Sequence, residues 1–369
     1  MDIKINKIKN TPQPEQRTNA WYEFRWNLLT ASSIWKAFLS PNTRKRLIYD
    51  KCKPLDLEKY NKFNINSSLH WGHKYEPLSV MVYENQFKTT VEDFGCIQHD
   101  TLKFLGASPD GIITDRESLL YGRMLEIKNI VNREIDGIPK YEYWIQMQMQ
   151  MECCNLNECD FLETKFTEYD CYDDYINDGT FSESSDGKMK GIMLLFLKDN
   201  KPHYEYHSLN ITLDQFLLWE EETMNNHKND VWVSRVYWKL EIISCVLVLR
   251  NKLWFKSAIP LLINTWKDIE KYRKDGYEHL APKKRTKKIT KQMSSGCLID
   301  IRTINGNYED NIIVVKKDAK NESILEEQKN TDLMEDNSII SNEMKAENNN
   351  IGKTDDIDIK IITPPLVSN

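Results

Sequence analysis

The sequence lacks the features that define membrane proteins and disulfide-stabilised proteins. No apolar run approaches the roughly eighteen residues that a membrane span needs, and the closest, LEIISCVLVL at 240–249, is shorter and contains Glu241. The first ten residues, MDIKINKIKN, have no apolar stretch, so no secretory signal is expected. The eight cysteines follow no disulfide spacing, which predicts reduced thiols in an intracellular protein.

The chain also lacks a strong charge of one sign. Its formal net charge is −6, but residues 321–369 hold eleven acidic and four basic residues, so residues 1–320 carry about +1. The only dense basic stretch is PKKRTKK at 282–288. Three interpretations of this stretch stay open: a nuclear import signal, a phosphate-binding strip or a solvated linker. A near-neutral body of this kind is compatible with nucleic-acid binding without requiring it.

What the chain does have is enough apolar material for a large core. It is 40% hydrophobic, with ten tryptophans and seventeen tyrosines. Strand and helix patterns alternate through residues 1–210, helical patterns dominate 211–280, and 281–369 is polar. We therefore expect an α/β core with a central mixed sheet flanked by helices, a helical extension at 211–280 that packs on it, and a mostly disordered tail, basic and then acidic, at 281–369.

The local patterns predict the following elements. Helices are expected at 21–38 (two short helices with a break near Thr30), 68–87, 141–154, 213–226, 232–256 and 261–274. Strands are expected at 94–99, 103–107, 112–114, 124–130, 160–167, 191–197 and 203–209, with weaker ones at 297–302 and 311–315. Pro77 predicts that the helix at 68–87 begins or kinks there.

The segment QMQMQM at 146–151 alternates with the period of a strand. Pro139 upstream and the good helix formers around it favour a helix instead. On a helix, Gln146 and Gln150 share one face.

Three charged residues on apolar segments carry the chemical signal. Asp110 lies in the turn SPDG, and Glu126 and Lys128 lie on the apolar run MLEIKNI at 124–130. On a strand, Glu126 and Lys128 project from one face, and Asp110 begins a neighbouring strand. Two carboxylates and a backbone carbonyl form a hard-oxygen site suited to Mg²⁺, and an adjacent lysine stabilises negative charge that develops on a phosphate. Phosphodiester hydrolysis needs this combination.

Each of these patterns also has an ordinary structural explanation. Glu126 can pair with Lys128 or Arg123 as a strand salt bridge, because the triplet Glu-x-Lys is common by chance. The sequence Pro-Asp-Gly makes a good turn in any protein. The patterns gain weight only when they are taken together.

Five sequence blocks then resemble one nuclease family. They are RWNLLTAS at 25–32, WGHKYE at 71–76, GASPDG at 106–111, LEIK at 125–128 and YWIQMQMQM at 143–151. In this order they are similar to the blocks of the YqaJ-type viral recombinases, the lambda-type exonuclease branch of the PD-(D/E)XK nucleases. The resemblance covers about residues 15–210.

The resemblance implies roles for individual residues. As catalytic residues it implies Asp110, Glu126, Lys128 and Gln146. As metal ligands it implies Glu76, Asp110, Glu126 and the carbonyl of Ile127, with Mg²⁺ as the cofactor and Mn²⁺ as a substitute. As the pocket for a terminal 5′-phosphate it implies Arg25, Ser32, Ser108 and Arg133, since guanidinium and hydroxyl groups suit phosphate oxygens.

The function that the resemblance implies is a Mg²⁺-dependent 5′→3′ exonuclease. It would degrade linear double-stranded DNA from its ends, in viral DNA recombination, repair or genome processing, with double-stranded DNA ends as its partner and no membrane. Family members form ring trimers and work with a single-strand annealing protein, and the host cytoplasm, as the site of viral replication, is expected ahead of the nucleus. Two alternatives stay open: a structure-selective or site-specific endonuclease with the same metal site, and a catalytically inactive DNA-binding module.

Two further groups of residues receive structural interpretations. Cys153, Cys154, Cys159 and Cys171 match no common cluster or zinc spacing, so no metal role is expected of them, and the adjacent Cys153 and Cys154 are expected to be core residues. His70 and His73 lie three residues apart on the helix at 68–87, where surface or packing roles are expected.

Overall fold

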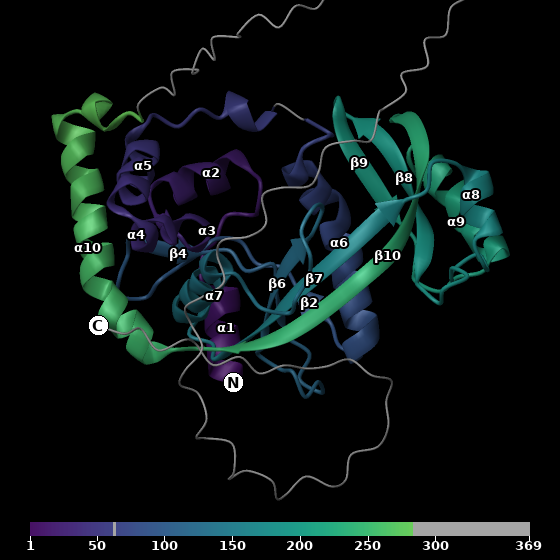
Figure 1. The fold of residues 1–369 in the computed structure, drawn as a ribbon, viewed down its shortest axis with the longest axis horizontal. Coiled ribbons are helices and arrows are strands. Elements are labelled where there is room, and N and C mark those ends of the chain that lie inside the picture. Colours follow the sequence, from purple (N-terminus) through teal and green to yellow (C-terminus); the bar gives the residue numbers. More distant parts are fainter. Residues whose placement is uncertain (62–63, 283–369) are drawn as a thin grey trace, which may run out of the picture. The chain divides into compact units, whose positions relative to one another are not determined.

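The computed structural model describes residues 1–61 and 64–282. In this part of the chain a seven-stranded mixed sheet has the strand order β2-β5-β6-β7-β10-β8-β9, and a three-stranded sheet has the order β1-β4-β3. Helices flank both sheets (Figure 1). The predicted α/β class with a central mixed sheet is therefore confirmed.

The strands are β1 (Leu29–Thr30), β2 (Val91–Glu92), β3 (Ile97–Gln98), β4 (Leu105–Ala107), β5 (Gly111–Ile113), β6 (Met124–Asn129), β7 (Glu158–Glu168), β8 (Lys190–Lys198), β9 (Lys201–Tyr206) and β10 (Val231–Leu249). The α-helices are α1 (Asp2–Asn10), α2 (Asn19–Trp26), α3 (Ala31–Ile34), α4 (Lys36–Leu39), α5 (Pro41–Cys52), α6 (Ser68–Phe87), α7 (Tyr141–Cys154), α8 (Tyr172–Asn177), α9 (Leu213–Asn226) and α10 (Lys252–Asp275). Two short 3₁₀ turns cover Glu58–Asn61 and Glu278–Leu280.

Strand β6 lies between helices on its two faces. Its side chains alternate, so Leu125 and Ile127 pack with Tyr83 of α6, whereas Met124 packs with Met147 of α7. All five side chains are 5% exposed or less. The charged residues of β6 share the face of Met124, and they therefore point toward α7.

A second apolar cluster joins the small sheet to α10. Leu29 and Leu105, which pair across the parallel strands β1 and β4, pack in it with Leu262 of α10. All three side chains are at most 1% exposed. Arg273, near the end of α10, donates to the backbone carbonyl oxygens of Trp26 and Lys51. Helix α10 thereby fixes the ends of α2 and α5.

The predicted helix at 232–256 is wrong over most of its length. Residues Val231–Leu249 form the strand β10, which pairs antiparallel with β8 through its first half and with β7 through its second half. Figure 1 shows β10 running from α10 to the strands β8 and β9. The segment at 211–280 is therefore not purely helical, since β10 lies inside the main sheet between β7 and β8.

Most of the other predicted elements are confirmed with shifted ends. The helices at 68–87, 141–154 and 213–226 agree with α6, α7 and α9. The predicted start or kink at Pro77 is not found as a break, because α6 runs from Ser68 to Phe87 through Pro77. Two short helices surround Thr30 as predicted, but β1 and a further short helix also lie there.

Several predictions fall on residues that the structure does not describe. These are the tail at 283–369, all but the first residue of PKKRTKK, and the weak strands at 297–302 and 311–315. Within residues 1–61 and 64–282, none of the helices combines the length and the apolar character that crossing a bilayer requires.

Candidate active site

Strand pairing places Asp110 and Glu126 on one face of the sheet. Gly111 of β5 lies opposite Leu125 of β6, so the preceding residue, Asp110, is next to Glu126 across the antiparallel ladder. The backbone N–H of Ile127 donates to Asp110 Oδ2 at 2.7 Å and fixes the carboxylate there. A Cβ at position 111 would lie 2.1 Å from a methyl group of Val91. Glycine in the turn SPDG is therefore required by the close approach of β2.

Glu126 is fully buried and is held by three donors. Gln146 donates its side-chain amide to Glu126 Oε1 at 2.7 Å, and Gln150 donates to Oε2 at 2.6 Å. Lys128 forms an ion pair with Oε1. The carboxylate is 0% exposed, and burying an unpaired charge would cost several kcal/mol. The glutamine face of α7 and the lysine on β6 together explain why the charge is tolerated.

The charges in this cluster perturb one another. Burial, followed by the negative charge of Glu126, raises the pKa of Asp110 well above its usual range. Burial disfavours the charged form of Lys128, but Glu126 and Asp110 overcome this effect and raise its pKa. Lys128 therefore stays cationic at any pH of interest, while the two carboxylates repel each other. An additional cation would relieve this repulsion.

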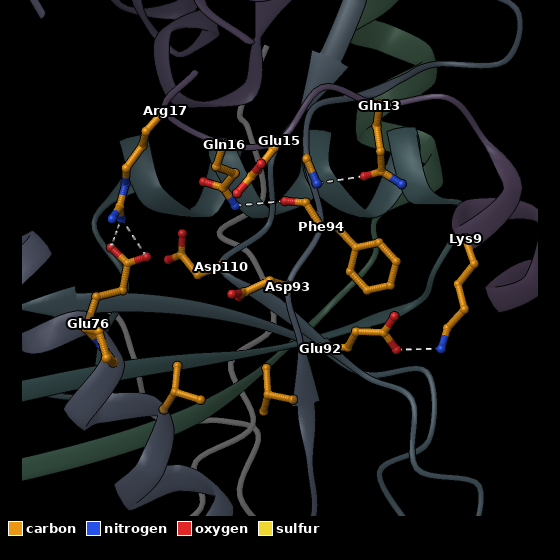
Figure 2. A pocket seen from close by; sticks show the side chains of 14 residues that line it. Lys9, Gln13, Glu15, Gln16, Arg17, Glu76, Glu92, Asp93, Phe94 and Asp110 are labelled. Atoms are coloured by element: carbon orange, nitrogen blue, oxygen red, sulfur yellow. Dashed lines mark hydrogen bonds and ion pairs between the residues drawn. The ribbon is translucent and has the colours of Figure 1, made fainter. Parts of the chain in front are cut away.

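Glu76 approaches the same place from α6 and is paired with Arg17. Arg17 Nη2 lies 3.0 and 2.8 Å from the two carboxylate oxygens of Glu76. Burial raises the pKa of Glu76, while the charge of Arg17 opposes the rise and that of Asp93 adds to it. Figure 2 shows the carboxyl groups of Glu76, Asp110 and Asp93 around one pocket, with Arg17 above Glu76. The pocket has a volume of about 670 Å³.

Asp110 lines this pocket and Glu126 lies next to Asp110 on the sheet, and this pair fits Mg²⁺. The side chains of Asp110 and Glu126 offer hard oxygen ligands, which Mg²⁺ prefers. Glu76 does not complete the set in this structure. A three-residue site would need one oxygen each from Glu76, Asp110 and Glu126, all within 4.8 Å of one another, and these residues do not meet that condition. In this structure both Glu76 oxygens accept from Arg17.

A second polar cluster lies beside the first and contains the predicted phosphate ligands. Arg25 donates to Ser108 Oγ at 3.1 Å and to Ser32 Oγ at 2.9 Å. Trp21 donates its ring N–H to Ser108 Oγ at 3.2 Å, and the Arg25 guanidinium lies 4.1 Å from the centre of the Trp21 ring. Burial lowers the pKa of Arg25. Within residues 1–61 and 64–282 no carboxylate forms an ion pair with this guanidinium, so the cluster is suited to an anion.

Lys51 adds a second cationic group to this cluster. Its ammonium donates to the backbone carbonyl of Arg25 at 2.7 Å. Burial, followed by the charges of Arg25 and Arg273, lowers the pKa of Lys51 to about 7. A lysine whose pKa is lowered this far gains a proton when an anion binds close by, because the anion raises the pKa again.

The structure does not bring Arg133 into the Arg25 cluster. Arg133 forms an ion pair with Glu163, which is 1% exposed. Its guanidinium lies 5.9 Å from the Tyr143 ring, over which the Lys128 ammonium also lies at 5.1 Å. Arg133 is therefore on the side of Lys128 and is already paired.

Sequence reasoning missed four residues of these clusters. They are Arg17, Trp21, Lys51 and Gln150. For Gln150 a signal was present, since it lies one helical turn after Gln146 and shares its face. The glutamine nearer in sequence, Gln148, points elsewhere and bonds the backbone of Leu249 and Asn251.

Cys153 and Cys154 lie in the core as expected, and the helix histidines have the expected surface or packing roles. Cys153, Cys154 and Cys159 are buried, Cys171 is exposed, and the seven cysteines in the described part of the chain are free. His70 bonds the Tyr204 hydroxyl at 2.7 Å.

Known proteins resemble this chain over different stretches. The uncharacterized protein R354 of Acanthamoeba polyphaga mimivirus is 32% identical over 311 residues, which cover 74% of this chain and 55% of that protein. The chain thus spans about half the length of this curated relative. The solved alkaline exonuclease LHK-Exo of Laribacter hongkongensis is 18% identical, with 69% of this chain and 94% of that chain covered and a TM-score of 0.42. A phage-related exonuclease of Haemophilus somnus 129PT is 12% identical, with 69% of this chain and 96% of that chain covered and a TM-score of 0.37.

The family comparison bears directly on the sequence blocks described above. Residues 20–157 match the model of the YqaJ-like viral recombinase domain. This range contains Arg25, Asp110, Glu126 and Lys128, and so it spans both polar clusters. The predicted resemblance is confirmed: residues 20–157 match a YqaJ-like viral recombinase domain.

Proposed function

We propose that this protein is a Mg²⁺-dependent exonuclease that degrades linear double-stranded DNA from its 5′ ends, in viral recombination, repair or genome processing. The observation that carries the proposal is the adjacency of the two polar clusters. Ser108 belongs to the cationic cluster and Asp110 to the acidic one. Two residues of extended chain span about 7 Å, which is on the order of one nucleotide step along a strand.

This spacing supports end recognition followed by release of one nucleotide. Arg25, Ser32 and Ser108 would hold the terminal 5′-phosphate, and the next phosphate along the strand would then reach Asp110 and Glu126. A cluster built for a terminal phosphate has little purpose in an enzyme that cuts within a duplex. The alternative of an endonuclease is therefore less well supported. The alternative of an inactive DNA-binding module is also less well supported, because the acidic cluster is intact.

The residues of the acidic cluster would divide the work. Asp110, Glu126 and Glu76 would hold the cation, which when bound supplies Lewis acidity at the scissile phosphate. Lys128 would donate to the phosphate oxygen on which negative charge develops. Gln146 and Gln150 would keep Glu126 in one orientation, so that it needs no rearrangement during the reaction.

Digestion of matched DNA substrates tests the proposal. We expect linear duplex with 5′-phosphates to be degraded in Mg²⁺ and not in EDTA, and covalently closed circles to be spared. Loss of one charge-assisted contact costs roughly 1.5–3 kcal/mol, so 5′-hydroxyl ends should react about ten- to a hundred-fold more slowly. Cleavage of closed circles at the same rate would instead establish the endonuclease.

The variant Arg25→Gln isolates the contribution of the cationic cluster. It should slow digestion of 5′-phosphorylated ends and erase the preference over 5′-hydroxyl ends. Arg46 is the matched control, since it is exposed and, in the part of the chain that the structure describes, its ion pair is with Asp50 on the same helix. Arg46→Gln should keep the preference. If wild-type protein showed no preference, end recognition by Arg25 would be refuted while the acidic cluster stayed in place.

A further inference from the structure

A second group of ligand-type side chains lies at the far edge of the main sheet. His203 and Glu205 stand two apart on the edge strand β9, so they share one face of that strand. His227 follows the last residue of α9. One ligand atom from each of these residues lies within 4.8 Å of the others, and this is the one such group of three among residues 1–61 and 64–282. Four strands separate β9 from β5, which follows Asp110 in the acidic cluster.

If His227 is neutral and Glu205 is ionised, one of the contacts of Glu205 brings two hydrogen-bond acceptors together without a donor. His227 Nδ1 lies 2.7 Å from Asp230 Oδ2, and a carboxylate only accepts, so this nitrogen carries the proton. In neutral histidine Nε2 is then an acceptor. Yet His227 Nε2 lies 3.0 Å from Glu205 Oε1, which is another acceptor. A further proton, on His227 or on Glu205, or a metal ion is therefore needed between the two atoms.

Three further observations favour the metal ion. His203 Nε2 lies 2.8 Å from the same Oε1 atom of Glu205, so that two imidazole nitrogens converge on one oxygen. Ligands at about 2.0–2.1 Å from a tetrahedral ion are about 3.3 Å apart, so each of the two nitrogen–oxygen pairs would need to open by no more than about 0.5 Å. The group also lies at the C-terminal end of the fourteen-residue helix α9, which favours a cation.

We propose that His203, Glu205 and His227 bind one divalent transition-metal ion of the Zn²⁺ type, with Asp230 positioning the ring of His227. Two imidazoles and one carboxylate form a donor set that zinc accepts, with the fourth position open to solvent. The Asp230 contact is the carboxylate–histidine arrangement that orients zinc ligands. Bound there, the ion ties the turn between α9 and β10 to the edge strand β9, and it serves stability rather than cleavage.

Metal retention by the full-length protein tests the proposal. Purified protein is loaded with Zn²⁺ in excess Mg²⁺, which occupies oxygen-only sites and competes poorly for imidazole. Metal content is then measured after dialysis, in a Cys171→Ser, Cys297→Ser background so that the exposed Cys171 and the undescribed Cys297 contribute nothing. We expect one Zn²⁺ per chain, and none in the double variant His203→Gln, His227→Gln. His279→Gln, at an exposed histidine outside the group, is the control and should retain the ion.

Two further readouts separate a built site from adventitious binding. Zn²⁺ at a hundred-fold excess over its dissociation constant should raise the melting temperature by about 5 °C in the background protein and not in the double variant. Asp230→Ala should weaken binding about 10–100-fold without abolishing it. Equal zinc content in the background protein and the double variant would overturn the proposal. So would the absence of retained metal in both, which would leave an ordinary hydrogen bond between His227 and Glu205.

Discussion

At the scale of the single residue, Lys128 offers the clearest separation of chemistry from binding. Its ammonium lies against Glu126 on the sheet, where negative charge on the scissile phosphate would develop. Lys128→Met should lower the single-turnover cleavage rate about 10²–10³-fold, while affinity for DNA, measured in Ca²⁺, changes far less. A parallel loss of both would make Lys128 a phosphate anchor rather than a catalytic residue.

Lys51 gives a pH-dependent prediction. Its pKa is lowered to about 7 in the folded protein, against about 10.4 in an unfolded chain. Between these values the unfolded state binds more protons, so the contribution of Lys51 to stability rises with pH in this window. A terminal phosphate bound beside Arg25 would reverse the shift, and binding at pH 8 should take up as much as about one proton.

Calorimetry in buffers of different ionisation enthalpy measures this uptake. Lys51→Met should bind 5′-phosphorylated ends without it. The stability of the variant should also lose the rise between about pH 7 and pH 10 that wild-type protein shows. If the variant took up the same proton, the titrating group would lie elsewhere.

Arg17 shows how a residue can hold a site in a resting arrangement. Its φ angle is +67°, which is uncommon for a residue with a side chain, and its guanidinium occupies both oxygens of Glu76. Arg17→Ala should release Glu76 toward Asp110 and Glu126. We expect tighter Mg²⁺ binding, measured by the Mg²⁺ concentration that gives half-maximal cleavage. An unchanged midpoint would show that Arg17 does not keep Glu76 from the cation.

At the scale of the element, β10 marks the limit of prediction from local sequence. Strands usually have three to ten residues, so the nineteen residues Val231–Leu249 favoured a helix by length alone, despite their β-branched and aromatic content. The length is explained only by tertiary structure, because β10 serves two partners in succession, β8 and then β7. Helices such as α6 and α9 could be predicted because their caps and periodicity are local.

A comparison of two positions on β10 tests the strand assignment. Trp238 and Ile242 would share a face on a helix, but the register shift between Leu240 and Ile242 puts Trp238 in the core, 2% exposed, and leaves Ile242 41% exposed. Trp238→Ala should lower the free energy of unfolding by about 3–5 kcal/mol, and Ile242→Ala by less than about 0.5 kcal/mol. Equal effects in urea titrations would contradict the strand.

The candidate site shows the same division between local and distant signals. Asp110, Glu126 and Lys128 could be predicted because strand alternation and the turn SPDG place them on one face. Arg17 and Lys51 could not, since they reach the clusters from segments far away in the chain and carry no motif. The pairing of Arg133 with Glu163 was equally hidden, because Glu163 lies on β7 and contacts it only through the fold.

At the scale of the whole molecule, charge is divided along the chain. Residues 321–369 carry a net charge of −7, and residues 1–320 carry about +1. Every residue of the two proposed nuclease clusters lies between Arg17 and Gln150, outside the acidic stretch. An acidic stretch on the same molecule repels the DNA phosphates and so weakens the electrostatic attraction between the whole protein and DNA. Salt screens this repulsion.

Deletion of residues 321–369 should therefore speed association with DNA ends at low salt by a few-fold and leave single-turnover cleavage of bound DNA unchanged. The gain should vanish at high ionic strength, where the Debye length falls to about 3 Å at 1 M. A full-length variant with the eleven acidic residues of this stretch changed to Asn or Gln separates charge from length, and it should reproduce the faster association. Stopped-flow association and quenched-flow cleavage measure the two steps separately. Slower cleavage of bound DNA by the deleted chain, but not by the neutralised one, would show that the stretch contributes to the reaction through something other than its charge.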